Sequence, residues 1–356
     1  MILDAIPTAL DALCRPELVR LGENLAAARF ELMKIVPARY ILEDALRTGK
    51  LGKGGTVVES SSGTFALGLA LCCVHLGLHL HLVTGPMEAS LHWRLEHLGA
   101  TVELVPDAGG GLGGIQQARL NRLEELIKDN PDLFWPRQYT NPLHPASYAS
   151  LARSFARSLG RVDVLVASVG TGGSICGIGR ELRVSNPALE VVAVDHNLSV
   201  LFGPTTGRVR PLCEECYVPL LGMGSDIVIP NLDHCECDEV HWVPVAKMIR
   251  AAHELHRTHG LLVGPTAGAA YAVAEWLART RPEASVLVVF PDGALRYLKT
   301  VFDREWLDAR SRELSVDWTE PQAVASPTAV GGDWERYRWR RRSYAEVLGH
   351  PPVSRS

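Results

Sequence analysis

Runs of consecutive apolar residues recur along most of the chain, and many end in a glycine- or serine-rich turn that leads into a helical pattern. Continuous apolar runs are typical of strands buried on both faces of a parallel sheet. We expect strands at residues 56–59, 78–83, 101–105, 134–138, 162–168, 189–194 and 285–290. We expect helices at residues 37–47, 65–76, 89–98 and 266–278. A further helix should follow a loop at residues 109–114 and end near residue 128, and another should follow residue 174.

The order of these elements indicates the fold class. Strands that alternate with helices predict an α/β fold with parallel-rich sheets covered on both faces. Because the pattern occurs in two sets, we expect two α/β domains with a cleft between them. The periodicity fades from about residue 314, and a basic and aromatic run follows at residues 336–342. We interpret this end of the chain as a solvated tail, with packing against the body or a partner subunit as the alternative.

Composition and charge exclude several classes of protein. The chain has 356 residues, 47% of them hydrophobic, which is enough for two domains with buried cores. Its net charge of −4 argues against general nucleic-acid binding. The apolar run at residues 65–83 is broken by Gly77 and contains three histidines, so we expect no membrane span. With no recognisable secretory start and eight cysteines, we expect a reduced, cytoplasmic protein.

The segment at residues 162–174 carries the strongest local signal for chemistry. A buried strand enters a turn, and a helix follows. The turn consists of Gly170, Thr171, Gly172, Gly173 and Ser174. Backbone N–H groups in such a turn, at the positive end of a helix, bind phosphate. Ile175 stands where the dinucleotide fingerprint needs its third glycine, which argues against a nicotinamide-dependent reductase; a plain tight turn is the other alternative.

Two further segments suggest a carboxylate site and a nucleophilic amine. Residues 60–64 place three serines and a threonine where a strand enters a helix, which suits a carboxylate, although N-capping needs only one of them. Lys34 lies in an apolar stretch before a helix that Pro37 can begin. Apolar surroundings lower the pKa of a lysine and favour a nucleophilic amine. On this stretch alone we favour a surface lysine with a buried aliphatic stem, and the nucleophilic amine is the alternative.

In combination, these segments resemble the pyridoxal-phosphate-dependent enzymes of fold type II, the family of cysteine synthase and the tryptophan synthase β subunit. The order and spacing of the motifs carry the resemblance, which covers roughly residues 15–305. The matching segments are residues 51–59, 60–65, 94–100, 138–142, 170–174, 222–225, 229–232, 264–270 and 296–298.

The resemblance implies a cofactor and roles for the site residues. Pyridoxal 5'-phosphate would lie in the cleft between the domains, bonded to Lys34 as a Schiff base, and the displaced lysine would take the Cα proton. Residues 170–174 would hold the phosphate. The substrate carboxylate would contact Ser61, Ser62, Gly63, Thr64 and Gln138. We expect a smaller, mobile domain at residues 40–145 that carries the carboxylate loop. We expect a larger domain, made of residues 1–39 and 146–312, that carries Lys34 and the phosphate loop. Residues 313–356 would form a C-terminal extension or tail.

Three positions depart from the family pattern. Residues 35–36 read Ile-Val where Asp-Arg usually follows the lysine. Thr64 replaces the Asn that contacts the ring hydroxyl of the cofactor, and its hydroxyl has a shorter reach. Residues 291–293 read Pro-Asp-Gly where a Ser near the pyridine nitrogen is common, so Asp292, Thr266 or water would contact that nitrogen. These departures indicate a divergent member.

The loop after residue 195 gives the best indication of the substrate. Residues 195–203 resemble the diaminopropionate-pathway branch, which joins O-phosphoserine to glutamate. Arg208 and Arg210 would grip a phosphate or a second carboxylate, unless they are surface charges. The resemblance implies a homodimer that performs β-replacement on O-acetylserine or O-phosphoserine through an aminoacrylate, giving cysteine or a diaminopropionate-type amino acid. The alternatives are β-elimination, as in a cysteine desulfhydrase or serine/threonine dehydratase, and a non-catalytic binding protein on the same fold.

Four cysteines form two close pairs, Cys213 with Cys216 and Cys235 with Cys237. Such pairs suit structural zinc or a redox switch. The spacing of the second pair is unusual for zinc, and the residues between the pairs belong to the expected active-site wall. We therefore expect ordinary thiols and no metal site, with zinc and redox chemistry as alternatives.

Overall fold

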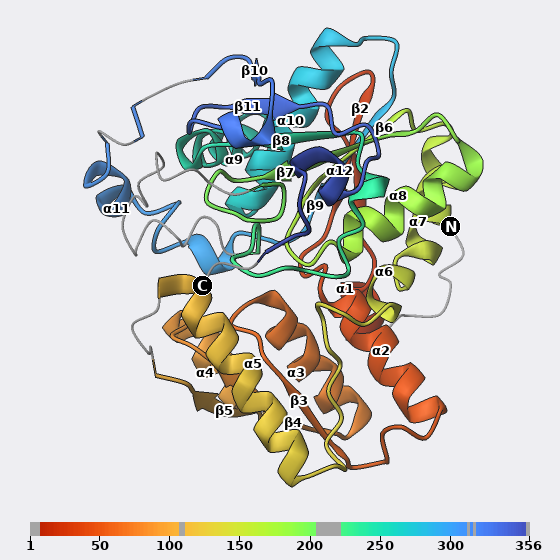
Figure 1. Ribbon diagram of the computed structural model, residues 1–356, viewed down its shortest axis with the longest axis vertical. Helices are drawn as coiled ribbons and strands as arrows, with labels where there is room; N and C mark the ends of the chain where they lie inside the picture. The colour runs from red at the N-terminus through yellow and green to blue at the C-terminus, as the bar shows by residue number, and fades with distance from the viewer. Residues whose placement is uncertain (1–7, 107–110, 204–221, 312–313, 316–317, 354–356) are drawn as a thin grey trace. The chain divides into compact units, whose positions relative to one another are not determined.

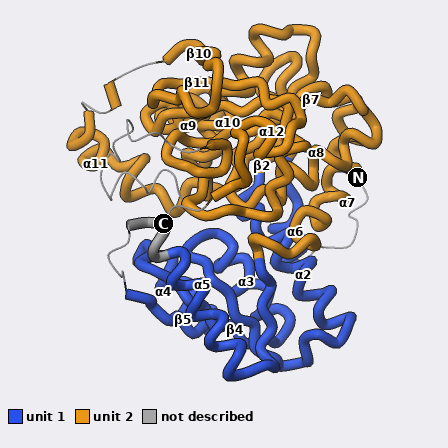
Figure 2. Tube along the Cα trace, viewed as in Figure 1, with its two compact units in different colours: residues 1–17, 30–137 blue, residues 18–29, 138–356 orange. Residues whose placement is uncertain are grey.

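The computed structural model describes residues 8–106, 111–203, 222–311, 314–315 and 318–353. The chain divides into two compact units, which Figure 2 shows in two colours. Unit 1 comprises residues 1–17 and 30–137, and unit 2 comprises residues 18–29 and 138–356. Both units alternate strands with helices, which confirms the α/β fold class. The units differ from the predicted domains at Lys34, which we assigned to the larger domain and which lies in the smaller unit.

Unit 1 is built on a parallel three-stranded sheet in the order β3-β4-β5 (Figure 1). Its strands are β3 (Thr56–Glu59), β4 (His79–Thr84) and β5 (Thr101–Leu104). Its helices are α1 (Ala9–Leu13), α2 (Ile35–Arg47), α3 (Thr64–Leu76), α4 (Ala89–His97) and α5 (Gly111–Asp129). Val58, Val83 and Leu123 pack together in the core, so α5 joins the two strands β3 and β4 there.

Unit 2 is built on an eight-stranded sheet in the order β1-β2-β9-β6-β7-β8-β11-β10. Strands β2, β9, β6, β7 and β8 run parallel. The strands are β1 (Glu17–Arg20), β2 (Leu25–Arg29), β6 (Val164–Ser168), β7 (Glu190–Asp195), β8 (Glu239–Trp242), β9 (Val286–Phe290), β10 (Gln322–Ala323) and β11 (Glu335–Tyr337). The helices are α6 (Leu143–Ala146), α7 (Ala149–Leu159), α8 (Gly173–Ser185), α9 (Val245–His259), α10 (Pro265–Thr280), α11 (Arg304–Asp308) and α12 (Tyr344–Leu348). All residues of β6, β8 and β9 are buried, as expected for strands covered on both faces.

Most predicted elements lie close to their predicted ends, and two predictions are wrong. Residues 134–138 are not a strand, because Phe134 makes only an isolated parallel bridge to Val57. Residues 111–114, predicted as loop, begin α5, since the long run of helix-forming residues after them carries the helix through the glycines. Across the described ranges, no helix is both long and apolar enough to cross a membrane.

The C-terminal segment (residues 322–348) is part of unit 2. Strand β11 pairs antiparallel with β8, and β10 pairs parallel with β11. The side chains of Trp334 and Trp339 are only 1% and 0% exposed. Our interpretation of this region as a solvated tail is therefore wrong, and the alternative of packing against the body is confirmed.

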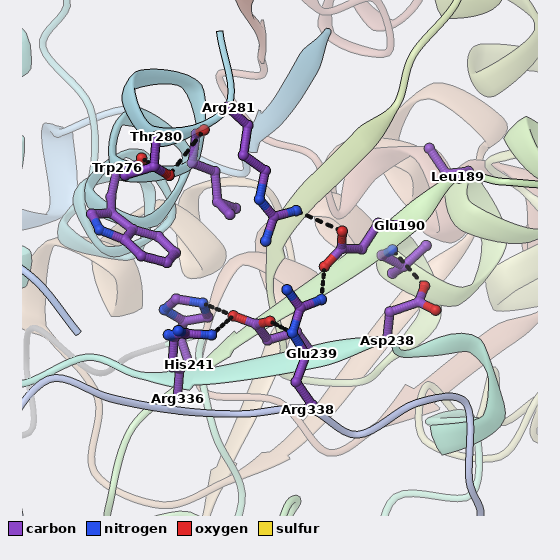
Figure 3. A network of polar contacts seen from close by, with 12 residues as sticks. Leu189, Glu190, Asp238, Glu239, His241, Trp276, Thr280, Arg281, Arg336 and Arg338 are labelled. Carbon is purple, nitrogen blue, oxygen red and sulfur yellow. Dashed lines mark hydrogen bonds and ion pairs between the residues drawn. The ribbon is translucent and has the colours of Figure 1, made fainter. Parts of the chain in front are cut away.

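The basic residues of this segment lie beside carboxylates of the neighbouring strands (Figure 3). Arg338 lies 2.6 Å from Glu190 and 2.6 Å from Glu239, and Arg336 lies 3.5 Å from Glu239. Although burial favours the neutral acid, His241 and these arginines hold the pKa of Glu239 below its ordinary value. The local pattern suggested solvation because the carboxylate partners lie far away in the sequence.

Candidate functional site

The loop at residues 170–174 joins β6 to α8 in unit 2, and its geometry requires glycine. A Cβ on Gly170 would lie 2.6 Å from the carbonyl oxygen of Gly222. A Cβ on Gly172 would lie 2.5 Å from the Cα of Leu232, and the φ of Gly172 is 74°, in the left-handed region. The loop therefore packs its own backbone against backbone on two sides, which a larger residue would prevent.

This loop fits the phosphate of pyridoxal 5'-phosphate. Helix α8 begins after Gly172, whose lack of a side chain leaves the N-cap position without a capping hydrogen bond. Its first backbone N–H groups therefore point out of the helix at the positive end of the dipole, where an anion is stabilised. The hydroxyls of Thr171 and Ser174 add polar groups to the same turn.

His144 is a residue of this region that sequence reasoning missed. Its Nδ1–H donates to the carbonyl oxygen of Gln138 at 2.8 Å, and the amide of Asn231 donates to the same oxygen at 3.0 Å. The remaining ring nitrogen, Nε2, lies 3.5 Å from the hydroxyl oxygen of Thr171. These contacts bring Gln138, predicted for the substrate carboxylate, to the phosphate loop. No spacing rule marks a histidine for this role, since it acts through tertiary contacts.

Asp292, the candidate for the pyridine nitrogen, lies just after β9 in unit 2 and is buried. Its carboxylate accepts a hydrogen bond from the hydroxyl of Tyr297 at 2.9 Å and lies 3.4 Å from the hydroxyl oxygen of Thr266. A Cβ on Gly264 would lie 2.4 Å from Asp292 Oδ1, so glycine is needed for this approach. The structure thus places two of the sequence candidates, Asp292 and Thr266, side by side, with Tyr297 as the residue that we missed.

Lys34 lies directly before α2 in unit 1, between buried Met33 and Ile35. Burial lowers the pKa of its amine to about 8, so much of it is neutral under mildly alkaline conditions. Helix α3 approaches the lysine backbone closely, because a Cβ on Gly68 would lie 3.1 Å from the Lys34 carbonyl oxygen. A fixed backbone and a lowered pKa are what a nucleophilic amine requires.

The serine-rich loop at residues 60–64 joins β3 to α3 in unit 1. The oxygen of Ser61 accepts hydrogen bonds from the backbone N–H groups of Gly63 at 3.4 Å and Ala66 at 3.2 Å, so this serine helps to cap α3. Its hydroxyl hydrogen is still able to donate to a carboxylate. Thr64 is the first residue of the helix.

Arg119 is a second residue that sequence reasoning missed. It lies on α5, is 8% exposed, and donates to the hydroxyl oxygen of Ser62 at 3.3 Å. An arginine on an amphipathic helix carries no local signal for a site, so only the tertiary structure reveals it. The arginines that we predicted for this purpose, Arg208 and Arg210, lie outside the described residues.

The cysteine pairs are described only in part, since Cys213 and Cys216 also lie outside the described residues. Cys235 is exposed, and Cys237 is buried close to the equally buried Cys176. Burial raises the pKa of Cys176 to about 12 and raises that of Cys237 well above its ordinary value, which makes thiolates unfavourable. Elsewhere in the described chain, no group of three or more His, Cys, Asp and Glu residues is arranged to hold a metal ion.

Comparison with known proteins identifies the family. The family model described as "Pyridoxal-phosphate dependent enzyme" matches residues 33–292. An N-(2-amino-2-carboxyethyl)-L-glutamate synthase of Cupriavidus metallidurans is 34% identical over 83% of this chain and 84% of the relative. Its counterpart from Ralstonia nicotianae is 34% identical over 76% of this chain and 78% of the relative. The crystal structure of an O-acetylserine dependent cystathionine beta-synthase from Helicobacter pylori matches 83% of this chain and 98% of its own, with 27% identity and a TM-score of 0.72. The chain belongs to the family of pyridoxal-phosphate-dependent enzymes, has their type II fold, and uses pyridoxal 5'-phosphate as its cofactor.

Proposed function

We propose that this enzyme catalyses β-replacement on an O-activated serine, with O-phosphoserine and glutamate as its leading substrates and a diaminopropionate-type amino acid as its product. The observation that carries the proposal is the 34% identity, over 83% of the chain, to an N-(2-amino-2-carboxyethyl)-L-glutamate synthase. The resemblance of residues 195–203 to the same branch supports it.

We assign the cofactor contacts as follows. Bound pyridoxal phosphate supplies the electron withdrawal that weakens the Cα–H bond of the substrate. Lys34 bonds the cofactor and moves the Cα proton, a task for which an amine with a pKa of about 8 is suited. Residues 170–174 hold the phosphate, and Asp292 accepts a hydrogen bond from the ring nitrogen. Tyr297 and Thr266 keep that carboxylate in place through their hydroxyls.

The substrate contacts are assigned to the serine-rich loop and to arginine. Residues 61–64 and Gln138 hold the α-carboxylate, which fixes the Cα–H bond for cleavage. Arg119, whose guanidinium lies 3.3 Å from the Ser62 hydroxyl, is suited to the phosphate of O-phosphoserine or to a second carboxylate. The Cβ–O bond would then break with both electrons leaving on the phosphate. The glutamate nitrogen would bond to Cβ and lose a proton, and Lys34 would return a proton to Cα.

The experiment is a product analysis of the holoenzyme. With O-phosphoserine and glutamate, we expect inorganic phosphate and the joined amino acid in equal amounts by mass spectrometry, and none from Lys34→Ala. Pyruvate in the amount of the phosphate, with glutamate unconsumed, would instead show β-elimination. Turnover with sulfide alone would show a cysteine-forming enzyme. A protein that keeps its visible cofactor band but turns over no pair would be a binding protein.

We also propose that the enzyme is cytoplasmic and that it is a homodimer, since fold type II enzymes generally form dimers. Size-exclusion chromatography with light scattering tests the dimer, for which we expect about twice the chain mass of 38.8 kDa. A mass equal to that of one chain would contradict this part of the proposal.

A further inference from the structure

Trp339, in the C-terminal segment, packs on the loop that follows β7. Its ring is fully buried and lies 5.2 Å, between centroids, from the ring of Phe202. It lies 5.3 Å from the ring of His234, and Tyr344 lies 5.3 Å from the same histidine. Buried aromatic clusters of this kind fix the side chains that form them, because each ring fills the space left by the others.

The residues beside Phe202 are held by the same cluster. The Nε2–H of His234 donates to the carbonyl oxygen of Leu201 at 2.6 Å. A Cβ on Gly203 would lie 3.1 Å from Pro327, which is itself in the C-terminal segment. Residues 199–203, which we call the β7 strap, therefore take their position from residues that lie far beyond them in the chain.

The β7 strap in turn holds the short wall at residues 222–225. The hydroxyl oxygen of Ser199 accepts hydrogen bonds from the backbone N–H of Leu201 at 3.1 Å and of Ser225 at 3.2 Å. The backbone N–H of Val200 donates to the Ser225 carbonyl oxygen at 2.8 Å. Strap and wall are thus joined by both backbone and side-chain hydrogen bonds.

The wall is in direct contact with the phosphate loop. The backbone N–H of Gly224 donates to the carbonyl oxygen of Val169 at 2.7 Å, immediately before that loop. The Gly222 carbonyl oxygen lies where a Cβ on Gly170 would approach to 2.6 Å. A continuous set of contacts inside unit 2 therefore runs from Trp339 through the strap and the wall to residues 169–170.

We propose that Trp339 is a positioning residue for the cofactor-phosphate loop and acts through the β7 strap and the wall at residues 222–225. The inference rests on the proposed role of residues 170–174. It goes beyond the family match, because the matched family model ends at residue 292 and Trp339 lies outside it. The C-terminal segment thereby contributes to cofactor binding without touching the cofactor.

Trp334 provides a matched control within the same segment. It is another buried tryptophan, but its ring packs on Trp276 at 6.4 Å and on His241 at 6.2 Å, and its indole N–H donates to His241 at 3.3 Å. Its removal should cost stability as removal of Trp339 does, since both leave a large cavity. It should leave the strap in place.

The test is the dissociation constant of pyridoxal phosphate, measured by titrating the apoprotein and following the visible absorbance. We expect Trp339→Ala to raise this constant about tenfold, while Trp334→Ala and the ring-preserving Trp339→Phe change it by about threefold or less. The melting temperatures of the two alanine variants should fall to a similar extent. If Trp339→Ala and Trp334→Ala change the constant equally, the positioning role is refuted.

Two further variants keep the test decisive. Phe202→Leu keeps an apolar side chain but removes the ring that Trp339 contacts, so we expect it to weaken cofactor binding even if Trp339→Ala does not fold. Gly172→Ala separates the two proposals, because it disturbs the backbone of the phosphate loop itself. If Gly172→Ala weakens binding while Trp339→Ala and Phe202→Leu behave like Trp334→Ala, the loop role stands and the positioning role fails. If Gly172→Ala has no effect either, the proposed loop role fails as well.

Discussion

Two loops of this chain have the same place in the architecture and opposite construction. Residues 60–64 join β3 to α3, and residues 170–174 join β6 to α8, each at the carboxyl end of a parallel strand. The first is ordered by a side chain, because the Ser61 oxygen accepts from two backbone N–H groups. The second is ordered by glycines in close backbone contact, and its N-cap residue, Gly172, has no side chain with which to cap the helix.

The difference separates two kinds of recognition. A glycine loop leaves the N–H groups of its helix to an anion, so its affinity for a phosphate depends on backbone shape. A serine loop presents hydroxyls, which bind through particular side chains and are altered one at a time. We therefore expect substitutions in the serine loop at residues 60–64 to change the choice of substrate. Substitutions in the glycine loop at residues 170–174 should instead change the affinity for the cofactor.

We expect the largest effect on cofactor affinity from a substitution that disrupts the glycine loop. Gly172→Ala places a Cβ where only 2.5 Å separates it from the Cα of Leu232, at a φ of 74°. We expect the dissociation constant of pyridoxal phosphate to rise about a hundredfold. Gly22→Ala is the control in the same unit, because its Cβ would meet Leu25 at an ordinary 3.6 Å. Equal affinity for pyridoxal phosphate in both variants would refute the role of the glycine backbone in binding the phosphate.

The next effect concerns the serine loop and its arginine. Arg119→Gln removes the guanidinium beside Ser62 and should raise the KM for O-phosphoserine about tenfold, with little change in the KM for O-acetylserine, which lacks the phosphate. Arg122→Gln is the control on the same helix, since Arg122 lies 2.6 Å from Glu103 instead. Steady-state kinetics with both donors measures the difference. An equal rise in KM for both donors would contradict the assignment of Arg119 to the phosphate of O-phosphoserine.

The next prediction concerns the stability of the neighbouring strand β7, which ends at Asp195. Burial raises the pKa of Asp195 from 3.8 to about 7, although the His196 N–H donates to it at 2.8 Å. The buried acid is protonated below that pKa, so its contribution to stability is lost as the pH rises through 7. Between pH 6 and pH 8 we expect the free energy of unfolding to fall by about 1.4 kcal/mol more than in Asp195→Asn. Urea unfolding of the apoproteins at both pH values measures it, and identical pH dependence in the two proteins would contradict the shift.

We expect the smallest effect, a change in stability, from substitutions of single serines in the serine loop. Ser61→Ala removes the oxygen that accepts from Gly63 and Ala66, and we expect a loss of about 1 kcal/mol in the free energy of unfolding. Ser62→Ala leaves that cap in place and should cost less. Thermal unfolding of both variants decides, and a larger loss in Ser62→Ala would show that Ser61 is not the structural serine of the loop.

The two loops also show how far local patterns reach. The strand at residues 56–59 and the glycine turn after β6 were predictable because each is encoded by consecutive residues. Arg119 and His144 were not, since their partners come from other elements and their own surroundings look ordinary. The same reason hid the C-terminal strand β11, whose arginines meet Glu190 and Glu239 only in the folded chain.

The most direct test of the account is to find the lysine that bonds the cofactor. The holoprotein is reduced with borohydride, digested, and mapped by mass spectrometry, with absorbance recorded before reduction. We predict a visible band and a pyridoxyl group on Lys34, both retained when the exposed Lys53 is changed to Ala and both lost in Lys34→Ala. A pyridoxyl group on another lysine, or an undiminished band in Lys34→Ala, would contradict the assignment on which the proposed chemistry depends.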